Sequence, residues 1–96
     1  MLEFQWDSGN IKHIIQDYPE RGNTIEEVES VFDDVHLSVL PNRIDPNQEA
    51  RFKAIGVSDQ GRVLVVVFIV RNELIRPISC WPANQQTRRR YHESIG

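Results

Sequence analysis

Arginine is the residue type in this chain best suited to chemistry on a phosphate group. Arg76 interrupts the apolar stretch LIRPISCWPA, residues 74–83, and further arginines stand at positions 51, 62 and 88–90. An arginine does not readily act as a base, but its planar guanidinium grips a phosphate through two parallel hydrogen bonds. Taken alone, an arginine on a strand more often forms a structural ion pair. If its side of the strand is buried, Arg76 is therefore expected to pair with an acidic residue of the N-terminal half.

The other reactive side chains give weaker signals. Cys80 is the only cysteine, and because no neighbour in the sequence would lower its pKa, it is expected to be a small buried side chain rather than a nucleophile. His13 lies roughly opposite an apolar stripe and is expected to be solvated. The sequence has no glycine-rich phosphate loop, no Cys/His pair at metal spacing and no nucleophile elbow. We therefore expect neither a metal nor another cofactor.

Charge is distributed unevenly along the chain. Residues 1–49 hold eleven of the fourteen Asp and Glu and three basic residues, a balance of −8, whereas residues 50–96 hold eight Lys and Arg and three acids, a balance of +5. The two halves attract each other, and the second half could attract phosphate. The alternative is a solvated surface whose charges happen to be segregated, and charge alone does not decide between the two.

The N-terminal half predicts one short strand followed by two helices. LEFQW alternates between apolar and polar residues, which favours a strand at residues 2–6. A first helix is expected to begin at Asp7 or Ser8, which offer capping oxygens, and to end at Pro19 and Gly22. Its apolar positions have helical spacing: Ile11, Ile14, Ile15 and Tyr18.

A second helix is predicted from Thr24 onward. Thr24 and Glu27 have the spacing of a capping box, in which each side chain caps the other residue's backbone N–H. Its apolar face consists of Ile25, Val28, Val31 and Phe32. The polar, proline-containing segment PNRIDPNQE, residues 41–49, is then expected to be a loop.

After residue 50 the apolar period changes from that of a helix to that of strands. ARFKAIGV, RVLVVVFIVR and LIRPISC predict three antiparallel strands joined by turns. Pro77 cannot donate a ladder hydrogen bond, so the last strand is expected to lie at an edge or to be bulged there. Pro82 suits the first turn of a helix that extends to about Ser94 and has no clear apolar stripe. Together these elements predict one α+β domain over residues 1–96.

A membrane span is not expected. The longest apolar run, residues 63–70, has eight residues, whereas a bilayer requires about 20. The N-terminus lacks the basic and apolar regions of a secretory signal, and a single cysteine cannot form an internal disulfide. A cytoplasmic location is therefore expected.

The order of several short blocks resembles the BrnT family of bacterial type II toxins. These blocks are FQWDSGN, TIEEVESVFDD, EARFKAIGVSDQGRVLVVVF, IRPIS and RRRY, and they extend from Phe4 to about Tyr91. The resemblance implies a RelE-like fold with two N-terminal helices, a small antiparallel sheet and a C-terminal helix. It also implies RNA cleavage without a metal and inhibition by BrnA, a ribbon-helix-helix antitoxin. DNA would be bound only indirectly, through that antitoxin.

The resemblance also implies a set of site residues. Arg51, Arg76 and Arg88 match family arginines and would stabilise charge on the RNA phosphate, while Tyr91 could transfer a proton or only pack. Further candidates for RNA binding are Arg62, Lys53, Trp81 and Arg89. Arg62 lies at a turn, where a solvated arginine is the commoner explanation. Trp81 could either stack on a base or cap the core.

The chain departs from the family pattern after IRPIS. The family usually has Ala-Arg-x-Ala and an acidic residue four positions later, whereas this chain has Cys80, Trp81, Pro82, Ala83 and then Thr87. One cationic and one acidic group are thus replaced. Two hypotheses follow: an RNA-cleaving toxin, of full or weak activity, or a non-catalytic member that acts through its complex with the antitoxin. A DNA- or RNA-binding module without an antitoxin has less support, because the acidic first half would repel nucleic acid.

Overall fold

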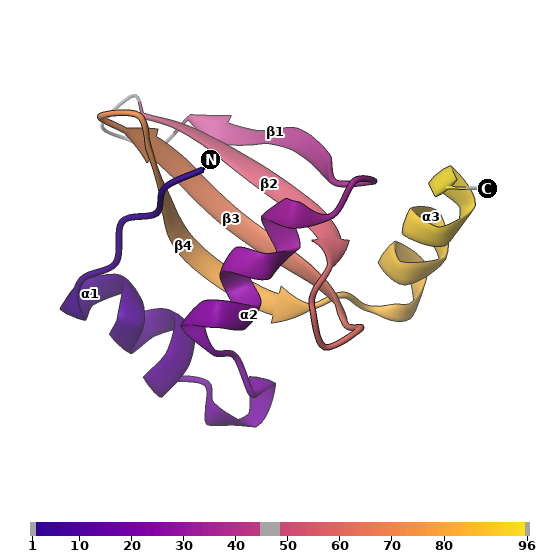
Figure 1. The fold of residues 1–96 in the computed structure, drawn as a ribbon, viewed down its shortest axis with the longest axis horizontal. Coiled ribbons are helices and arrows are strands. Elements are labelled where there is room, and N and C mark those ends of the chain that lie inside the picture. The colour runs from indigo at the N-terminus through magenta and orange to yellow at the C-terminus, as the bar shows by residue number, and fades with distance from the viewer. Residues whose placement is uncertain (1, 45–48, 96) are drawn as a thin grey trace.

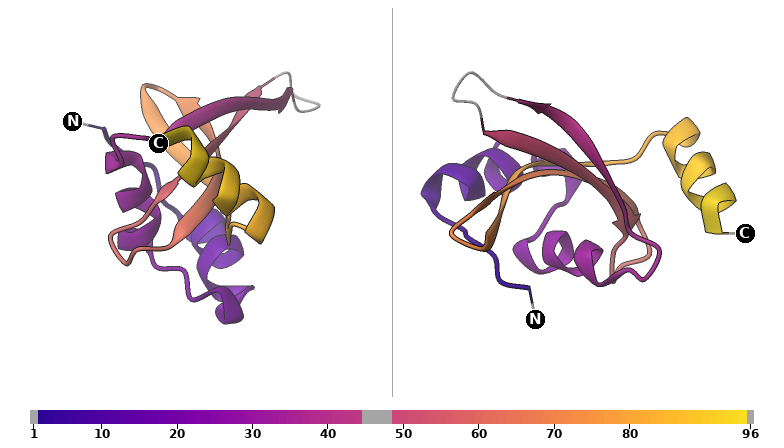
Figure 2. Two further views of the ribbon diagram at one scale, coloured as in Figure 1. Left: turned by 90° about the vertical axis from the view of Figure 1, so that its right-hand side faces the viewer. Right: turned by 90° about the horizontal axis from the view of Figure 1, so that it is seen from above.

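Four antiparallel strands form a twisted sheet that organises the molecule (Figures 1 and 2). The computed structural model describes residues 2–44 and 49–95. The strands are β1 (Ser38–Ile44), β2 (Ala50–Val57), β3 (Val63–Arg71) and β4 (Leu74–Pro82). Their order in the sheet follows their order in the sequence. This confirms the predicted α+β architecture and the antiparallel meander after residue 50.

Strand β3 is the central element. Its residues 63–69 are all buried, although they point alternately to the two faces of the sheet. Both faces must therefore be covered in this region, as the continuous apolar run predicted. Strand β2 pairs with one edge of β3 and β4 with the other.

The prediction of a loop at residues 41–49 was wrong for its first part. Residues 41–44 belong to β1, and residues 45–48 lie outside the described residues. Strand β1 pairs with β2 alone, so it forms an edge of the sheet, where a proline is tolerated because its missing N–H is not needed on the open side. The register of β1 shifts between Pro41 and Ile44.

The predicted strand at residues 2–6 is also wrong. Phe4 forms one isolated parallel bridge with Ile75. Gln5 N donates to Ile75 O at 2.8 Å, and Ile75 N donates to Glu3 O at 2.9 Å. Residues 3–5 therefore cover part of the free edge of β4 without forming a strand.

The two predicted N-terminal helices are present, but each is short and changes type. Helix α1 (Ser8–Ile11) is capped by Asp7 and continues as the π-helix η1 (Lys12–Gln16). A 3₁₀ turn, η2 (Pro19–Arg21), ends at Gly22, whose left-handed conformation (φ 66°) suits glycine. Helix α2 (Ile25–Ser30) is capped by Thr24 and continues as the 3₁₀ turn η3 (Val31–Asp33).

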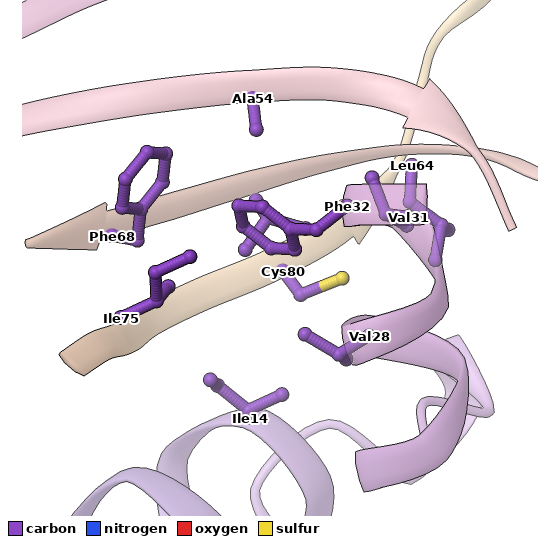
Figure 3. Packing of buried hydrophobic residues seen from close by; sticks show 10 residues of the cluster. Ile14, Val28, Val31, Phe32, Ala54, Leu64, Phe68, Ile75 and Cys80 are labelled. Carbon is purple, nitrogen blue, oxygen red and sulfur yellow. The ribbon is translucent and has the colours of Figure 1, made fainter. Parts of the chain in front are cut away.

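These helices pack on one face of the sheet, called here the inner face, and bury the main core (Figures 2 and 3). Phe32 of η3 meets Phe68 of β3 edge to face, with ring centroids 5.3 Å apart. Ile14 and Val28 bring the two helices onto the same cluster and are completely buried. Of the apolar positions that the helical spacing had identified, five join this core and three do not: Ile14, Ile15, Val28, Val31 and Phe32 join it, whereas Ile11, Tyr18 and Ile25 lie outside it.

Helix α3 (Gln85–Ile95) lies across one end of the sheet on the opposite side, called here the outer face (Figure 2). It begins three residues after Pro82, which remains the last residue of β4, so the prediction that Pro82 opens the helix was wrong. Asn84 caps it instead, through its side-chain oxygen and Thr87 N at 2.8 Å. Tyr91, the buried residue of this helix, joins a second apolar cluster with Val63, Val65 and Ala83.

None of the helices within residues 2–44 and 49–95 has the length and apolar character that a membrane crossing requires.

Candidate functional site

A bulge in β4 places Arg76 on the outer face. Val67 pairs with Ser79, but the next residue, Phe68, pairs with Pro77, so Ile78 is an extra residue. Strand side chains alternate between faces, and one extra residue reverses this alternation. Without the bulge Arg76 would face the same side as the completely buried Cys80. The bulge that Pro77 predicted is thus present, and it moves the arginine out of the core.

Arg76 forms the expected ion pair with an acid of the N-terminal half. Its Nη1 lies 2.7 Å from Asp7 Oδ2 and its Nη2 lies 3.2 Å from Asp7 Oδ1. Asp7 Oδ1 also accepts hydrogen bonds from Gly9 N and Asn10 N at the start of α1. The hydrogen bonds from Arg76, and after them the one from Asn10 N, hold the pKa of Asp7 below its usual value. One carboxylate thus caps a helix and orients a guanidinium.

Two of the predicted site residues, Arg51 and Arg76, lie in one row on the outer face of the sheet. Ile69 of β3 pairs with Arg76 of β4. Arg51 of β2 lies one position beyond the Phe52–Phe68 pair, which places it opposite Ile69. The three residues therefore form a row across β2, β3 and β4.

Lys53 stands in the next row of the same face. It pairs with Val67 in β3, which in turn pairs with Ser79 in β4. Val67 and Ile69 are buried although α1 and α2 lie on the other face. On the outer face of the sheet, these two buried apolar side chains thus lie among the long cationic side chains of Arg51, Lys53 and Arg76.

The arginines of α3 are arranged differently. Arg88 Nη1 donates to Ala83 O at 2.7 Å, so this side chain folds back on the start of its own helix. Arg89 is exposed. These two residues add positive charge beside the outer face, but they are not part of the row formed by Arg51, Ile69 and Arg76.

The Tyr91 side chain is buried, and its hydroxyl group already forms a hydrogen bond within the protein. The residue is 5% exposed, and its O–H donates to Asp34 Oδ2. Burial, together with the hydrogen bond to Asp34, raises the pKa of Tyr91 to about 12. Burial acts to raise the pKa of Asp34, but hydrogen bonds from Tyr91, Val57 N and His36 N outweigh it and keep that pKa low. In this arrangement the Tyr91 hydroxyl is protonated and already donates its hydrogen bond to Asp34.

Arg62 belongs to a structural network on the other side of the molecule. Its Nε and Nη2 donate to the Glu27 carboxylate at 2.8 and 2.7 Å, and its Nη1 donates to Arg21 O at 2.8 Å. Glu27 also accepts the hydroxyl of Ser58 at 2.6 Å, and its side chain is only 7% exposed. The hydrogen bonds from Arg62 lower the pKa of Glu27.

This network corrects the predicted capping box. Thr24 Oγ1 accepts Glu27 N, as predicted, but the Glu27 carboxylate binds Arg62 and Ser58 instead of the backbone at Thr24. Arg62 is thereby drawn toward α2 and away from the row of Arg51 and Arg76.

The residues that follow the bulge are part of the packing. Trp81 pairs with Val65 and packs against the cluster that contains Tyr91, which favours its role as a cap on this apolar cluster. Cys80 is completely buried, and burial raises its pKa to about 12. The prediction of a small buried cysteine is confirmed.

Sequence reasoning did not identify two buried asparagines that support the bulged strand. Asn10 Nδ2 donates to Pro77 O at 3.0 Å, and Asn23 Nδ2 donates to Cys80 O at 3.0 Å. Both are buried polar side chains on the helical layer. They satisfy carbonyls on either side of Ile78 and so hold the segment that carries Arg76. No local sequence signal distinguishes them from ordinary capping or turn asparagines.

Comparison with known proteins shows the family to which the chain belongs. Among curated proteins, none matches the chain in sequence. The sequence pattern of one family, described as "Ribonuclease toxin, BrnT, of type II toxin-antitoxin system", matches residues 6–87. The matched range begins before Asp7, extends past Arg76 and ends within α3, so it includes the helical layer and the whole sheet. The chain belongs to the BrnT family of ribonuclease toxins of type II toxin-antitoxin systems.

Proposed function

We propose that this protein is a metal-independent endoribonuclease of low activity that binds RNA on the outer face of its sheet. The observation that carries the proposal is the row of Arg51, Ile69 and Arg76 across three adjacent strands, with Lys53 in the next row. Cationic side chains gathered on one face suit an RNA strand, because guanidinium groups bind its phosphates.

The reaction needs few groups. The 2′-oxygen of a ribose attacks the adjacent phosphorus while a base accepts its proton. The bond from phosphorus to the 5′-oxygen of the next nucleotide breaks, and that oxygen takes up a proton. Arg51 and Arg76 stabilise the negative charge that builds up on the phosphate in the transition state. The products are a 2′,3′-cyclic phosphate and a 5′-hydroxyl, and no metal is required.

The expectation of low activity rests on the proton-transfer groups. The Tyr91 hydroxyl keeps its proton and donates a hydrogen bond to Asp34, and its pKa is raised to about 12. The pKa of Asp7, the carboxylate closest to Arg76, is lowered, which makes it a weak base. Arg51 and Arg76 can thus stabilise charge on the phosphate, whereas Asp7 and Tyr91 are poorly suited to transfer the protons. Arg62 is left out of the RNA-binding set because its contacts with Glu27 hold it beside α2, away from the row of Arg51 and Arg76.

A second candidate function is a non-catalytic member of the family that acts through its complex. The occupied hydroxyl of Tyr91 favours this alternative, because it removes the one phenol that the family resemblance offered for proton transfer. The two candidates differ in one measurable property, which is RNA cleavage by the protein alone.

The type II family implies an antitoxin protein as partner. We propose a BrnA-like ribbon-helix-helix antitoxin whose acidic or amphipathic segment covers the outer face and α3. The support is electrostatic: residues 50–96 carry a balance of +5, and α3 buries only Tyr91. Contact with DNA would then occur only through the antitoxin. Co-purification with the product of a neighbouring antitoxin gene at low salt is the test, because complementary charges bind best there.

The cleavage proposal is tested by inducing the protein alone in a bacterial host and mapping new RNA ends by primer extension. The proposal expects slowed growth and new ends in the wild type, and Arg76→Ala should reduce cleavage about 10² to 10³-fold. Lys12→Ala is the matched control, because it removes an exposed, ion-paired cation from the helical layer. If the wild type produces no new RNA ends but binds the antitoxin tightly, the cleavage proposal is wrong and the non-catalytic function is supported.

A further inference from the structure

A groove lies between the outer face of β1 and β2 and the helix α3. It has a volume of about 220 Å³. The cross-strand pair Leu40–Lys53 forms part of its floor, and α3 closes one side. Its lining includes Ser38, Leu40, Lys53, Ile55, Thr87, Arg90 and Tyr91.

The charge of this groove is unusual for the molecule. The chain has fourteen acidic residues, yet no carboxylate is among the groove's lining residues within the described parts of the chain. Lys12, Arg62, Arg71 and Arg76 each lie within 4 Å of a carboxylate. Lys53 and Arg90, by contrast, form no ion pair within residues 2–44 and 49–95. Two cations without a counter-ion therefore face one cavity, which favours an anionic ligand.

The rest of the lining suits a flat ligand that is partly apolar. Leu40 is 45% exposed, and the half-buried Ile55 adds apolar surface beside it. Thr87 and Ser38 contribute hydroxyl groups at the rim. Cations, an apolar floor and a few hydroxyls are together the chemistry that binds a nucleotide, through its phosphate, its base face and its base edges.

The groove is continuous with the proposed cleavage face. Lys53 lines the groove and also stands two residues from Arg51 on the same side of β2, about 6.8 Å along the strand. One nucleotide of an extended RNA strand spans such a distance. A phosphate held by Arg51 and Arg76 would thus have its neighbour at Lys53.

From this geometry we infer that the groove is a nucleotide subsite, which binds the nucleotide next to the cleaved phosphate and selects its base. The inference rests on the proposed function and deepens it, because it locates sequence preference between β1, β2 and α3. Base selection would come from Thr87 and Ser38 at the rim, and phosphate binding from Lys53 and Arg90.

Binding of single nucleotides tests the subsite without any need for cleavage. The folded protein is titrated separately with AMP, GMP, CMP and UMP while backbone amide NMR shifts are followed. We expect the shifts to centre on residues 38–40, 53–55 and 87–94, and to be larger for some bases than for others. Inorganic phosphate alone is the control. If it gives the same shifts and affinity as the nucleotides, the site binds only phosphate and the inference is wrong.

Two variants test the groove from opposite sides. Arg90→Glu reverses a cation and should weaken nucleotide binding about tenfold or more, because attraction is replaced by repulsion. Leu40→Trp fills the groove from the exposed edge strand and should abolish base preference. Lys12→Glu makes the same charge change in the helical layer and should leave binding unchanged. Equal binding by all three variants would overturn the inference.

The same variants separate this inference from the proposed function. Nucleotide binding in the groove by a protein that cleaves no RNA would refute the cleavage proposal and support the subsite. Cleavage whose sites are the same in the wild type, Arg90→Glu and Leu40→Trp would support the cleavage proposal and refute the subsite.

Discussion

Arg76 and Asp7 join the last strand to the start of the first helix through two hydrogen bonds of 2.7 and 3.2 Å. The arginine side chain is 15% exposed and the carboxylate is 50% exposed. Asp7 therefore shields one side of the guanidinium while remaining open to water itself. The orientation of Arg76 on the outer face depends on this contact and on the bulge at Ile78.

Replacement of Asp7 by Asn separates the ion pair from the helix cap, because asparagine also caps helices well. The pKa of Asp7 lies below its ordinary value of 3.8 in the folded protein, so its charged form stabilises the fold above that pH. This stabilisation is lost as the pH falls through 3.8 toward the lowered pKa. We expect the wild type to be more stable than Asp7→Asn at pH 7, with a difference that shrinks in acid.

Urea unfolding at a series of pH values from neutral to acidic measures this difference. Asp17→Asn is the control for loss of a surface carboxylate. A difference between the wild type and Asp7→Asn that stayed constant across the series would show that charge pairing with Arg76 is not its origin.

Arg62→Ala is expected to destabilise the fold through Glu27. The variant leaves a carboxylate that is 7% exposed without its bidentate partner. Complete loss of a partner in a buried pair costs about 3 to 5 kcal/mol, and because Arg62 is one-third exposed we expect about 2 to 3 kcal/mol. Chemical unfolding of the two single variants and of Arg62→Ala with Glu27→Gln gives the coupling between them.

Cleavage by Arg62→Ala offers an independent check of its role. If Arg62 is structural, the rate per folded molecule stays near that of the wild type, while Arg76→Ala loses most of its activity. A loss of equal size in both variants at a temperature where both are folded would return Arg62 to the RNA-binding set.

Tyr91→Phe removes the hydroxyl group but keeps the ring in its apolar cluster. Asp34 then retains the hydrogen bonds from Val57 N and His36 N, so we expect a loss of only about 1 kcal/mol in unfolding free energy. RNA cleavage should change little, because the hydroxyl is held by Asp34. A fall in cleavage of about 100-fold or more would instead identify Tyr91 as a proton donor or acceptor.

Cys80 is expected to be unreactive in the folded protein. It is completely buried, and its pKa is raised to about 12, so almost no thiolate forms at neutral pH. A thiol reagent in excess should label it at a rate set by unfolding and independent of reagent concentration. Labelling that increases in proportion to the reagent, under conditions where the protein is folded, would contradict this expectation.

Local sequence patterns predicted the elements whose cause is local. The spacing of Ile11, Ile14 and Ile15 fits a helical period, and the β-branched residues of the continuous apolar run in β3 favour a strand. The whole of strand β1 (Ser38–Ile44) was missed, because Pro41 and its polar neighbours resemble a loop. Its extended state comes from pairing with β2, which is a tertiary effect.

The site was predictable in kind but not in detail. The sequence indicated that Arg76 would need an acidic partner, and it could not identify Asp7 among eleven N-terminal acids. The Tyr91 hydroxyl is bound to Asp34, which lies 57 residues away in the sequence, and the Arg62 guanidinium is bound to Glu27, 35 residues away. Such pairings are decided by the folded arrangement of the chain and leave no periodic signal.

The contacts of residues 3–5 with Ile75 cover part of the edge of β4. They also limit when the site can form during synthesis. Proteins are made from the N-terminus, so Phe4 and Asp7 leave the ribosome long before Ile75 and Arg76 exist. Until Ile75 and Arg76 have been added, the nascent chain can form neither the bridge nor the ion pair, whatever its helices have already done. The cationic row on the outer face therefore cannot be completed before β4 has been synthesised.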